Sequence, residues 1–275
     1  MATVSKLLLP PPALTSCIAV GVFRDTRPAR LSDPDRVNYF PASPLFTVTK
    51  ILSGQILVSD GIGGLETLRS GRVMRDLDVL GPQSSPTVSW CPGAVAAFTV
   101  GFFPDAWSTL AAAEESDALP TKLLPVFATL DRQENPHAAW NAFCEALAPI
   151  WSDCNGAHGQ NAAANLTDWL RHLMTRLAVS SSGRSVRSVE RRLRSWTGQN
   201  RQALSFYSKI EELHALSIKT PNASPAELAF DAGYADQSHM GRAVKRATGF
   251  SPSALNARID KDEAFWCYRL MGERF

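Results

Sequence analysis

The sequence predicts an α+β protein with a β-rich N-terminal half, a helical connector and an all-α C-terminal domain. Three observations carry this prediction. Short apolar runs separated by Gly and Pro fill residues 17–103, apolar residues recur at helical spacing after Pro104, and basic residues concentrate near the end of the chain. The 275 residues suffice for two domains, and 45% hydrophobic with 20% charged residues is an ordinary globular composition.

The N-terminal half is expected to form a small β-barrel or sandwich, because several short strands alternate with turn residues. Ser16–Phe23 and Val95–Phe103 are apolar runs, the latter stopped by Pro104. Phe46–Leu52 and Gln55–Ser59 flank Ser53-Gly54, which predicts a hairpin. Gly61, Gly63 and Gly64 mark a loop that is not a phosphate loop, because no lysine follows at the required place and no helix is expected to open there.

The connector is expected to be helical. Asn135 precedes Pro136 as an N-cap would, and an apolar stripe follows at helical spacing: Trp140, Phe143, Leu147, Ile150 and Trp151. The stripe fits either a helix packed on its own domain or a dimerisation helix. The Gly/Asn/Ala-rich residues 154–164 predict a linker, and Leu166–Ala178 predicts an amphipathic helix.

We therefore predict four segments. They are a β-rich sensor (1–103), a helical connector with a dimerisation region (104–165), a self-contained basic helical domain (166–259) and a C-terminal tail (260–275).

Charge divides the chain in the same way. Residues 1–179 carry 13 Lys and Arg against 16 Asp and Glu, whereas residues 180–259 carry 12 against 6. A sensor joined to a nucleic-acid binder explains this asymmetry, and so does a solvated basic face.

Cysteine and histidine usage bears on metal binding and location. The five cysteines are widely spaced without a CxxC, and the five histidines lack metal-ligand spacing, so we expect no disulfide framework, metal site or cofactor. Pro10–Pro12 interrupt the apolar N-terminus, and no run approaches ~20 apolar residues, so we expect a cytoplasmic protein without a membrane span.

The clearest motif is residues 224–249. Ser224 and Glu227 form a capping box around Pro225, Gly233 permits a sharp turn, and Asp236 is an N-cap for a second helix. In that second helix the inward positions are Met240, Ala243, Val244 and Ala247, and the opposite face is polar and basic. A helix, a glycine-containing turn and a basic helix are what a reader of the DNA major groove needs, although a solvated surface helix has the same pattern.

This segment resembles the second helix-turn-helix of the AraC-type (AraC/XylS) transcription regulators, and residues 185–198 resemble the first recognition helix. Here Ser185 is the cap, Val186, Val189, Leu193 and Trp196 face inward, and Arg184 stands where the family has an apolar residue. The resemblance implies two such units joined by a helix over about Gln199–Ile218, reading successive major grooves.

The resemblance assigns DNA contacts residue by residue. Base-facing positions of the first unit are Arg187, Ser188, Glu190 and Arg191, and those of the second are Gln237, Ser238, His239 and Arg242. Phosphate-facing positions are Arg194, Lys245 and Arg246.

The resemblance also implies a cupin-like barrel as the sensor, double-stranded promoter DNA as the partner, and a homodimer. A small-molecule effector and RNA polymerase are further partners to be tested. Two rival hypotheses are an enzyme and a protein adaptor. A metal-dependent catalytic barrel is disfavoured because no histidine precedes His137, and an alkyl-acceptor repair protein because no cysteine has an activating local setting. We therefore expect no enzymatic activity and no catalytic residue.

Overall fold

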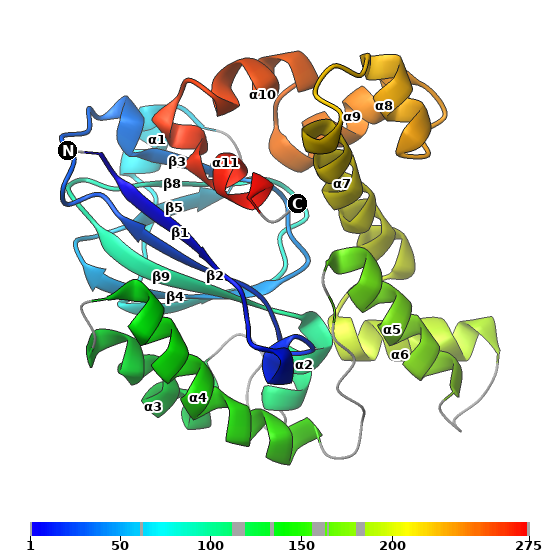
Figure 1. Cartoon of the computed structure of the whole chain (residues 1–275), viewed down its shortest axis with the longest axis horizontal. Helices are drawn as coiled ribbons and strands as arrows, with labels where there is room; N and C mark the ends of the chain where they lie inside the picture. The colour runs from blue at the N-terminus through cyan, green and yellow to red at the C-terminus, as the bar shows by residue number, and fades with distance from the viewer. Residues whose placement is uncertain are drawn as a thin grey trace.

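The computed structural model describes residues 2–60, 63–111, 119–132, 135–155, 163, 165–179 and 185–273. A β-rich N-terminal half carries helices along one side, and a helical C-terminal half lies beside it (Figure 1). The final helix returns from the helical half to the β-rich half (Figure 1). The expected α+β architecture, with β-structure first and helices last, is therefore confirmed.

The N-terminal half contains two antiparallel sheets. The larger sheet has the order β1-β2-β9-β4-β7, and the smaller has the order β3-β8-β5-β6. The larger sheet consists of Val4–Leu8 (β1), Ile18–Asp25 (β2), Ala96–Phe102 (β9), Phe46–Ser53 (β4) and Leu77–Leu80 (β7). The smaller consists of Val37–Phe40 (β3), Thr87–Trp90 (β8), Leu57–Asp60 (β5) and Arg72–Val73 (β6). Two short 3-10 turns, Pro12–Leu14 (η1) and Pro34–Arg36 (η2), connect strands.

The hairpin expected around Ser53-Gly54 is wrong. β4 pairs with β7 and β9, whereas β5 pairs with β6 and β8, so the two strands belong to different sheets. Gly54 has φ +85°, and a Cβ there would lie 2.2 Å from the backbone oxygen of Ala94. The glycine thus lets the chain cross from one sheet to the other instead of folding back on itself.

Two other N-terminal features differ from the expectation. β1 is an additional strand ahead of the proline run, paired with β2 at the sheet edge. A five-residue helix, Leu65–Arg69 (α1), follows Gly64, where we expected none. Gly61 lies outside the described residues.

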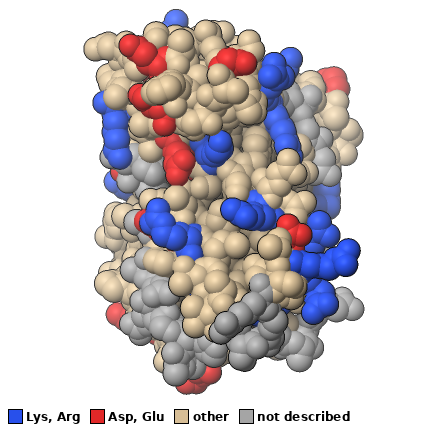
Figure 2. All heavy atoms as spheres, turned by 90° about the vertical axis from the view of Figure 1, so that its right-hand side faces the viewer, with Lys and Arg blue, Asp and Glu red and all other residues tan. Residues whose placement is uncertain are grey.

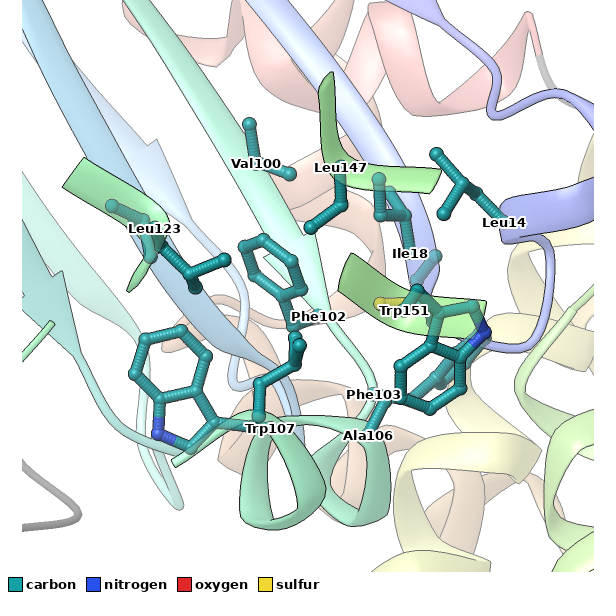
Figure 3. Packing of buried hydrophobic residues seen from close by; sticks show 14 of the residues in the cluster. Leu14, Ile18, Val100, Phe102, Phe103, Ala106, Trp107, Leu123, Leu147 and Trp151 are labelled. Carbon is teal, nitrogen blue, oxygen red and sulfur yellow. The ribbon is translucent and has the colours of Figure 1, made fainter. Parts of the chain in front are cut away.

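Helices cover one face of the larger sheet (Figure 1). They are Pro104–Leu110 (α2), Thr121–Leu123 (η3), Leu124–Phe127 (α3), Ala128–Arg132 (η4) and Pro136–Asn155 (α4). Figure 3 shows Phe102, Trp107 and Leu147 of this shared core side by side.

The apolar stripe of α4 is used within the chain. The indole N–H of Trp140 donates to Leu9 O at 2.9 Å, and that of Trp151 donates to Ser16 Oγ at 3.2 Å. Phe143 and Leu147 are fully buried. Of the two interpretations of the stripe, packing on its own domain is therefore the one observed. The expected cap is present as well, because the His137 N–H donates to Asn135 Oδ1 at 2.8 Å.

Gly21 explains how closely α4 approaches the sheet. A Cβ at Gly21 would lie 2.6 Å from the ring of Trp140, well inside van der Waals contact. The absence of a side chain in β2 lets the indole lie directly on the strand backbone.

The C-terminal half is helical. It contains Leu166–Val179 (α5), Val186–Thr197 (α6), Arg201–Lys219 (α7), Pro225–Asp231 (α8), Gln237–Thr248 (α9), Pro252–Ile259 (α10), Glu263–Phe265 (η5) and Trp266–Gly272 (α11). Most of the expected linker and the turn at residues 180–184 lie outside the described residues.

The buried clusters of the helical half extend into the front half. Trp169, Leu193 and Leu204 belong to the same buried cluster as the larger sheet and α4. Val37, Val88 and Trp90 of the smaller sheet join the cluster formed by α7–α11. Both halves thus contribute to the same hydrophobic clusters, and the self-contained C-terminal core stays a prediction.

Candidate nucleic-acid interface

The second candidate unit is α8, a turn and α9. The Ser224 hydroxyl accepts from the Glu227 N–H at 3.3 Å, while the Ser224 N–H donates to Glu227 Oε2 at 2.7 Å. The hydrogen bond from this backbone N–H lowers the pKa of the Glu227 carboxyl. Gly233 ends the unit's first helix at φ +70°, and Asp236 Oδ1 caps the next by accepting from the His239 N–H at 2.6 Å. The expected capping box, glycine turn and Asp cap are all present.

α9 has the two faces that its sequence predicts. Met240, Val244 and Ala247 are buried, and Ala243 is half-buried. Gly249 closes the helix at φ +82°. One face therefore holds the helix in the domain and leaves the opposite face free for a ligand.

The first candidate unit is α5 with α6. Ser185 caps α6 by accepting from the Ser188 N–H at 3.2 Å, and Gly198 ends it at φ +70°. Leu193 is buried, and Val189 and Trp196 are half-buried. Val186 is 76% exposed, so its inward assignment is wrong. It is the first residue of α6, ahead of the turn of helix whose side chains reach the core.

α7 joins the two units. Asn200 caps it by accepting from the Ala203 N–H at 2.8 Å, and Leu204, Tyr207 and Leu213 are buried, as expected. α7 contacts α5 in the first unit and both α8 and α9 in the second. Lys209 of α7 donates to Gly233 O at 3.1 Å, which fixes the turn between α8 and α9.

The structure places nearly all of the proposed DNA-contacting side chains in solvent. Ser188 is the half-buried exception, and its hydroxyl donates to Ser185 O at 2.8 Å within the cap. The exposed members are Arg187, Glu190, Arg191, Arg194, Gln237, Ser238, His239, Arg242, Lys245 and Arg246.

Two of these residues are held by neighbours. The Arg246 guanidinium lies 4.4 Å from the ring centroid of Phe206 in α7, and the His239 ring meets Tyr234 edge-on at 5.4 Å. In the described part of the chain no ion pair engages Arg187, Arg242 or Lys245. Lys and Arg side chains lie across the middle of the face that carries the helical half (Figure 2). Such cations remain free to neutralise phosphates.

Sequence reasoning missed the contacts between the halves. The buried Asp105 carboxylate accepts from the Trp169 indole at 2.8 Å and from Arg176 Nη1 at 2.8 Å. The Trp169 ring also stacks on Phe103, with centroids 5.2 Å apart. Ser108 donates to Trp196 O at 2.9 Å. These contacts fasten the first unit to α2 of the front half.

The C-terminal segment, which we expected to be only a tail, forms a second contact between the two halves. The indole N–H of Trp266 donates to Asn38 Oδ1 at 2.7 Å, and Arg24 pairs with Glu263. The Arg24 guanidinium also lies 4.8 Å from the Trp266 ring. Burial in this contact lowers the pKa of Arg24. Residues 263–272 thus return the chain from the helical half to β2 and β3.

Residues 179–258 match a family model described as a helix-turn-helix domain. The match runs from the last residue of α5 to Arg258 in α10 and therefore includes the two capped helices α6 and α9. This segment is an AraC-type helix-turn-helix domain. A helix-turn-helix domain is a DNA-binding unit, so residues 179–258 form a DNA-binding domain. No curated protein matches the chain by sequence.

Solved structures of ToxT from Vibrio cholerae are similar in outline. An apo variant has 9% identity, covers 85% of this chain and 95% of its own, and superposes with a TM-score of 0.41. A 1.65 Å structure has 10% identity, covers 92% and 96%, and has a TM-score of 0.37. Wild-type ToxT bound to an unsaturated fatty acid has 12% identity, 79% and 92% coverage, and a TM-score of 0.34.

Among the described residues no group of three His, Cys, Asp or Glu side chains could hold a metal ion. None of the described helices is both long enough and apolar enough to cross a membrane.

Proposed function

We propose that the chain reads a specific promoter sequence by placing α6 and α9 in successive major grooves on one side of the duplex. The observation that supports this most directly is the pair of capped, outward-facing recognition helices joined by α7. The 19 residues of α7 span about 28 Å at 1.5 Å per residue. That length is close to the ~34 Å between successive major grooves.

The exposed side chains divide by chemistry. On the exposed face of α9, Gln237 suits adenine, Arg242 suits guanine, and Ser238 and His239 offer further donors and acceptors. At the start of α6, the corresponding positions are Arg187, Ser188, Glu190 and Arg191. Later in each helix, Arg194, Lys245 and Arg246 suit phosphates, which hold the protein on any sequence. The stacking of Arg246 on Phe206 limits its rotation, so less side-chain entropy is lost when it binds.

We also propose that residues 1–103 with the connector 104–165 form a control module for the DNA-binding module 166–259. The contacts of Asp105 with α5 and of Ser108 with α6 support this division of roles, because they connect α2 of the front half to the DNA-binding module. An effector or partner bound by the front half would alter promoter occupancy or contact with RNA polymerase. A cytoplasmic homodimer is the assembly that we propose.

Selection from random DNA duplexes by the full chain, followed by footprinting, tests the proposal. The expected result is two short conserved half-sites whose centres lie about 10 base pairs apart. Enrichment without a consensus would contradict sequence-specific reading. A single half-site would contradict the use of both helices.

A further inference from the structure

The loop between β3 and β4, residues 41–45, connects the C-terminal ends of α6 and α9. The Ala42 N–H donates to Ala247 O, in the last turn of α9, at 2.7 Å. Two residues later, Pro44 O accepts at 3.1 Å from Nε2 of Gln199, which lies two residues beyond the end of α6. Two residues of extended chain span about 7 Å at most. One short segment of the front half is therefore hydrogen-bonded to both DNA-reading units.

The front half meets the two units at equivalent points. Each of the two helices ends in a buried threonine followed by glycine, at Thr197 and at Thr248. Both hydroxyls donate to the carbonyl oxygen four residues earlier, at 2.7 and 2.8 Å. The residue before the threonine is Trp196 in α6 and Ala247 in α9. Trp196 O accepts from the Ser108 hydroxyl at 2.9 Å, as Ala247 O does from the loop. Carbonyl groups at a helix end lack partners within the helix, so these donors hold both helices at matching positions.

The loop itself is held in place. Pro41 and Pro44 fix two of its φ angles and so restrict its motion. Ser43 and Gln83 exchange two backbone hydrogen bonds, at 3.0 and 2.8 Å, which attach the loop to the turn before β8. The Tyr207 hydroxyl of α7 donates to the same Gln83 O at 3.2 Å. The loop is thereby a rigid spacer that rests on the helix joining the two units.

This second connection restricts how the two units can move relative to each other. With α7 as the single connection, a rotation at either end of α7 would turn one recognition helix relative to the other. Two connections fix both the distance and the relative rotation of α6 and α9. Each base pair added between two DNA sites displaces them by about 3.4 Å and rotates them by roughly 35°. A fixed pair of helices therefore fits one separation of half-sites better than any other.

We propose that loop 41–45 sets the spacing between half-sites that the chain accepts, with Ala42 and Gln199 as positioning residues. The inference rests on the proposed function, because it requires both recognition helices to bind one duplex. Base preference within a half-site depends on the exposed faces of α6 and α9, whereas the loop contacts the C-terminal end of each helix. Loosening the loop should therefore change the preferred spacing and leave base preference as it was.

The test measures dissociation constants of the full chain on the selected duplex and on duplexes with one base pair inserted or removed between the half-sites. For the wild type, each change of spacing should weaken binding about tenfold or more, because one recognition helix no longer meets its bases. Gln199→Ala removes the hydrogen bond to Pro44 O, and Ala42→Pro removes the N–H that binds Ala247 O. Each variant should reduce the spacing penalty by about threefold or more, which is what one hydrogen bond contributes.

Gln202→Ala is the matched control for Gln199→Ala. Gln202 is exposed in the first turn of α7, three residues further along the chain, so its loss should leave the spacing penalty unchanged. Single-base changes within the half-sites should cost both loop variants what they cost the wild type. A purely structural defect would instead weaken binding to all duplexes by one factor and leave the penalty as it was.

A reduced spacing penalty with unchanged base preference, in either folded variant, is the predicted result. An unchanged penalty in both folded variants would overturn the role of the loop, while the two half-sites selected by the wild type would still support the proposed function. Tighter binding by the variants at every spacing would also overturn it, because the loop would then hold the helices away from their DNA-reading arrangement. If the wild type selects no pair of half-sites, the proposed function fails and the inference fails with it.

Discussion

The hydrogen bonds of the Asp105 carboxylate should be a main stabilising contact between the front half and the first DNA-reading unit. It is 94% buried and accepts two hydrogen bonds at 2.8 Å, from Trp169 and from Arg176. A hydrogen bond to a charged group contributes ~1.5–3 kcal/mol, and the Arg176 bond lies at the low end because that side chain is about a third exposed. In Asp105→Asn the amide oxygen still accepts one of the two hydrogen bonds, but as an uncharged acceptor. The amide NH2 group is itself a donor and cannot accept the second hydrogen bond, which is lost. We expect the free energy of unfolding to fall by about 2 kcal/mol.

Urea unfolding of the full chain, followed by circular dichroism, measures this change. Asp153→Asn is the matched control, because Asp153 is exposed on α4, and its effect should stay within about 0.5 kcal/mol. An Asp105→Asn variant that unfolds at the same urea concentration as the control would refute the reasoning. It would mean that the stacking of Trp169 on Phe103 alone holds the contact.

Three other predictions follow from the fold and its charge. The logarithm of DNA affinity should fall with the logarithm of salt concentration by ~0.9 units per phosphate contacted, and a flat response in fluorescence anisotropy would contradict binding through the basic helices. Gly21→Ala should lower the free energy of unfolding by ~1–3 kcal/mol, because the new Cβ would collide with the ring of Trp140. Gly93→Ala is the control, because no atom lies within 4 Å of a Cβ at that position. Equal melting curves for the two variants would contradict the close approach of Trp140 to the sheet. Burial lowers the pKa of His214, so the histidine of the unfolded chain binds a proton at a higher pH than that of the folded chain. The free energy of unfolding should therefore fall as the pH drops below the ordinary pKa of histidine. His214→Gln should reduce this fall in urea titrations at several pH values.

The local signals of the C-terminal domain could be predicted from the sequence because their partners are close along the chain. The capping box of Ser224 and Glu227, the cap at Asp236 and the turn at Gly233 each depend on residues within a few positions. The inward stripe of α9 likewise repeats within one helix. The helix boundaries and the outward positions of Arg242 and Lys245 follow from these signals.

Long-range pairing could not be predicted in the same way. Asp105 meets residues 64 and 71 positions away, and Trp266 meets Asn38 from 228 positions away. Two strands that follow each other around a glycine predict a hairpin at Gly54, yet β4 and β5 belong to different sheets. A local sequence pattern does not indicate which distant strand or helix supplies the hydrogen-bonding or packing partner.

The central claim is that the outer face of α9 reads bases while the side chains further along it hold phosphates. The direct measurement is the dissociation constant of wild type, Arg242→Ala, Lys245→Ala and Arg187→Ala on the selected duplex and on every single-base change of it. Arg242→Ala should cost ~1–3 kcal/mol and relax preference at one base pair. Arg187→Ala should show a weaker form of the same pattern. Lys245→Ala should weaken binding to all duplexes alike and lower the salt slope by about one unit. The account is contradicted if Lys245→Ala changes base preference, or if Arg242→Ala weakens every duplex equally.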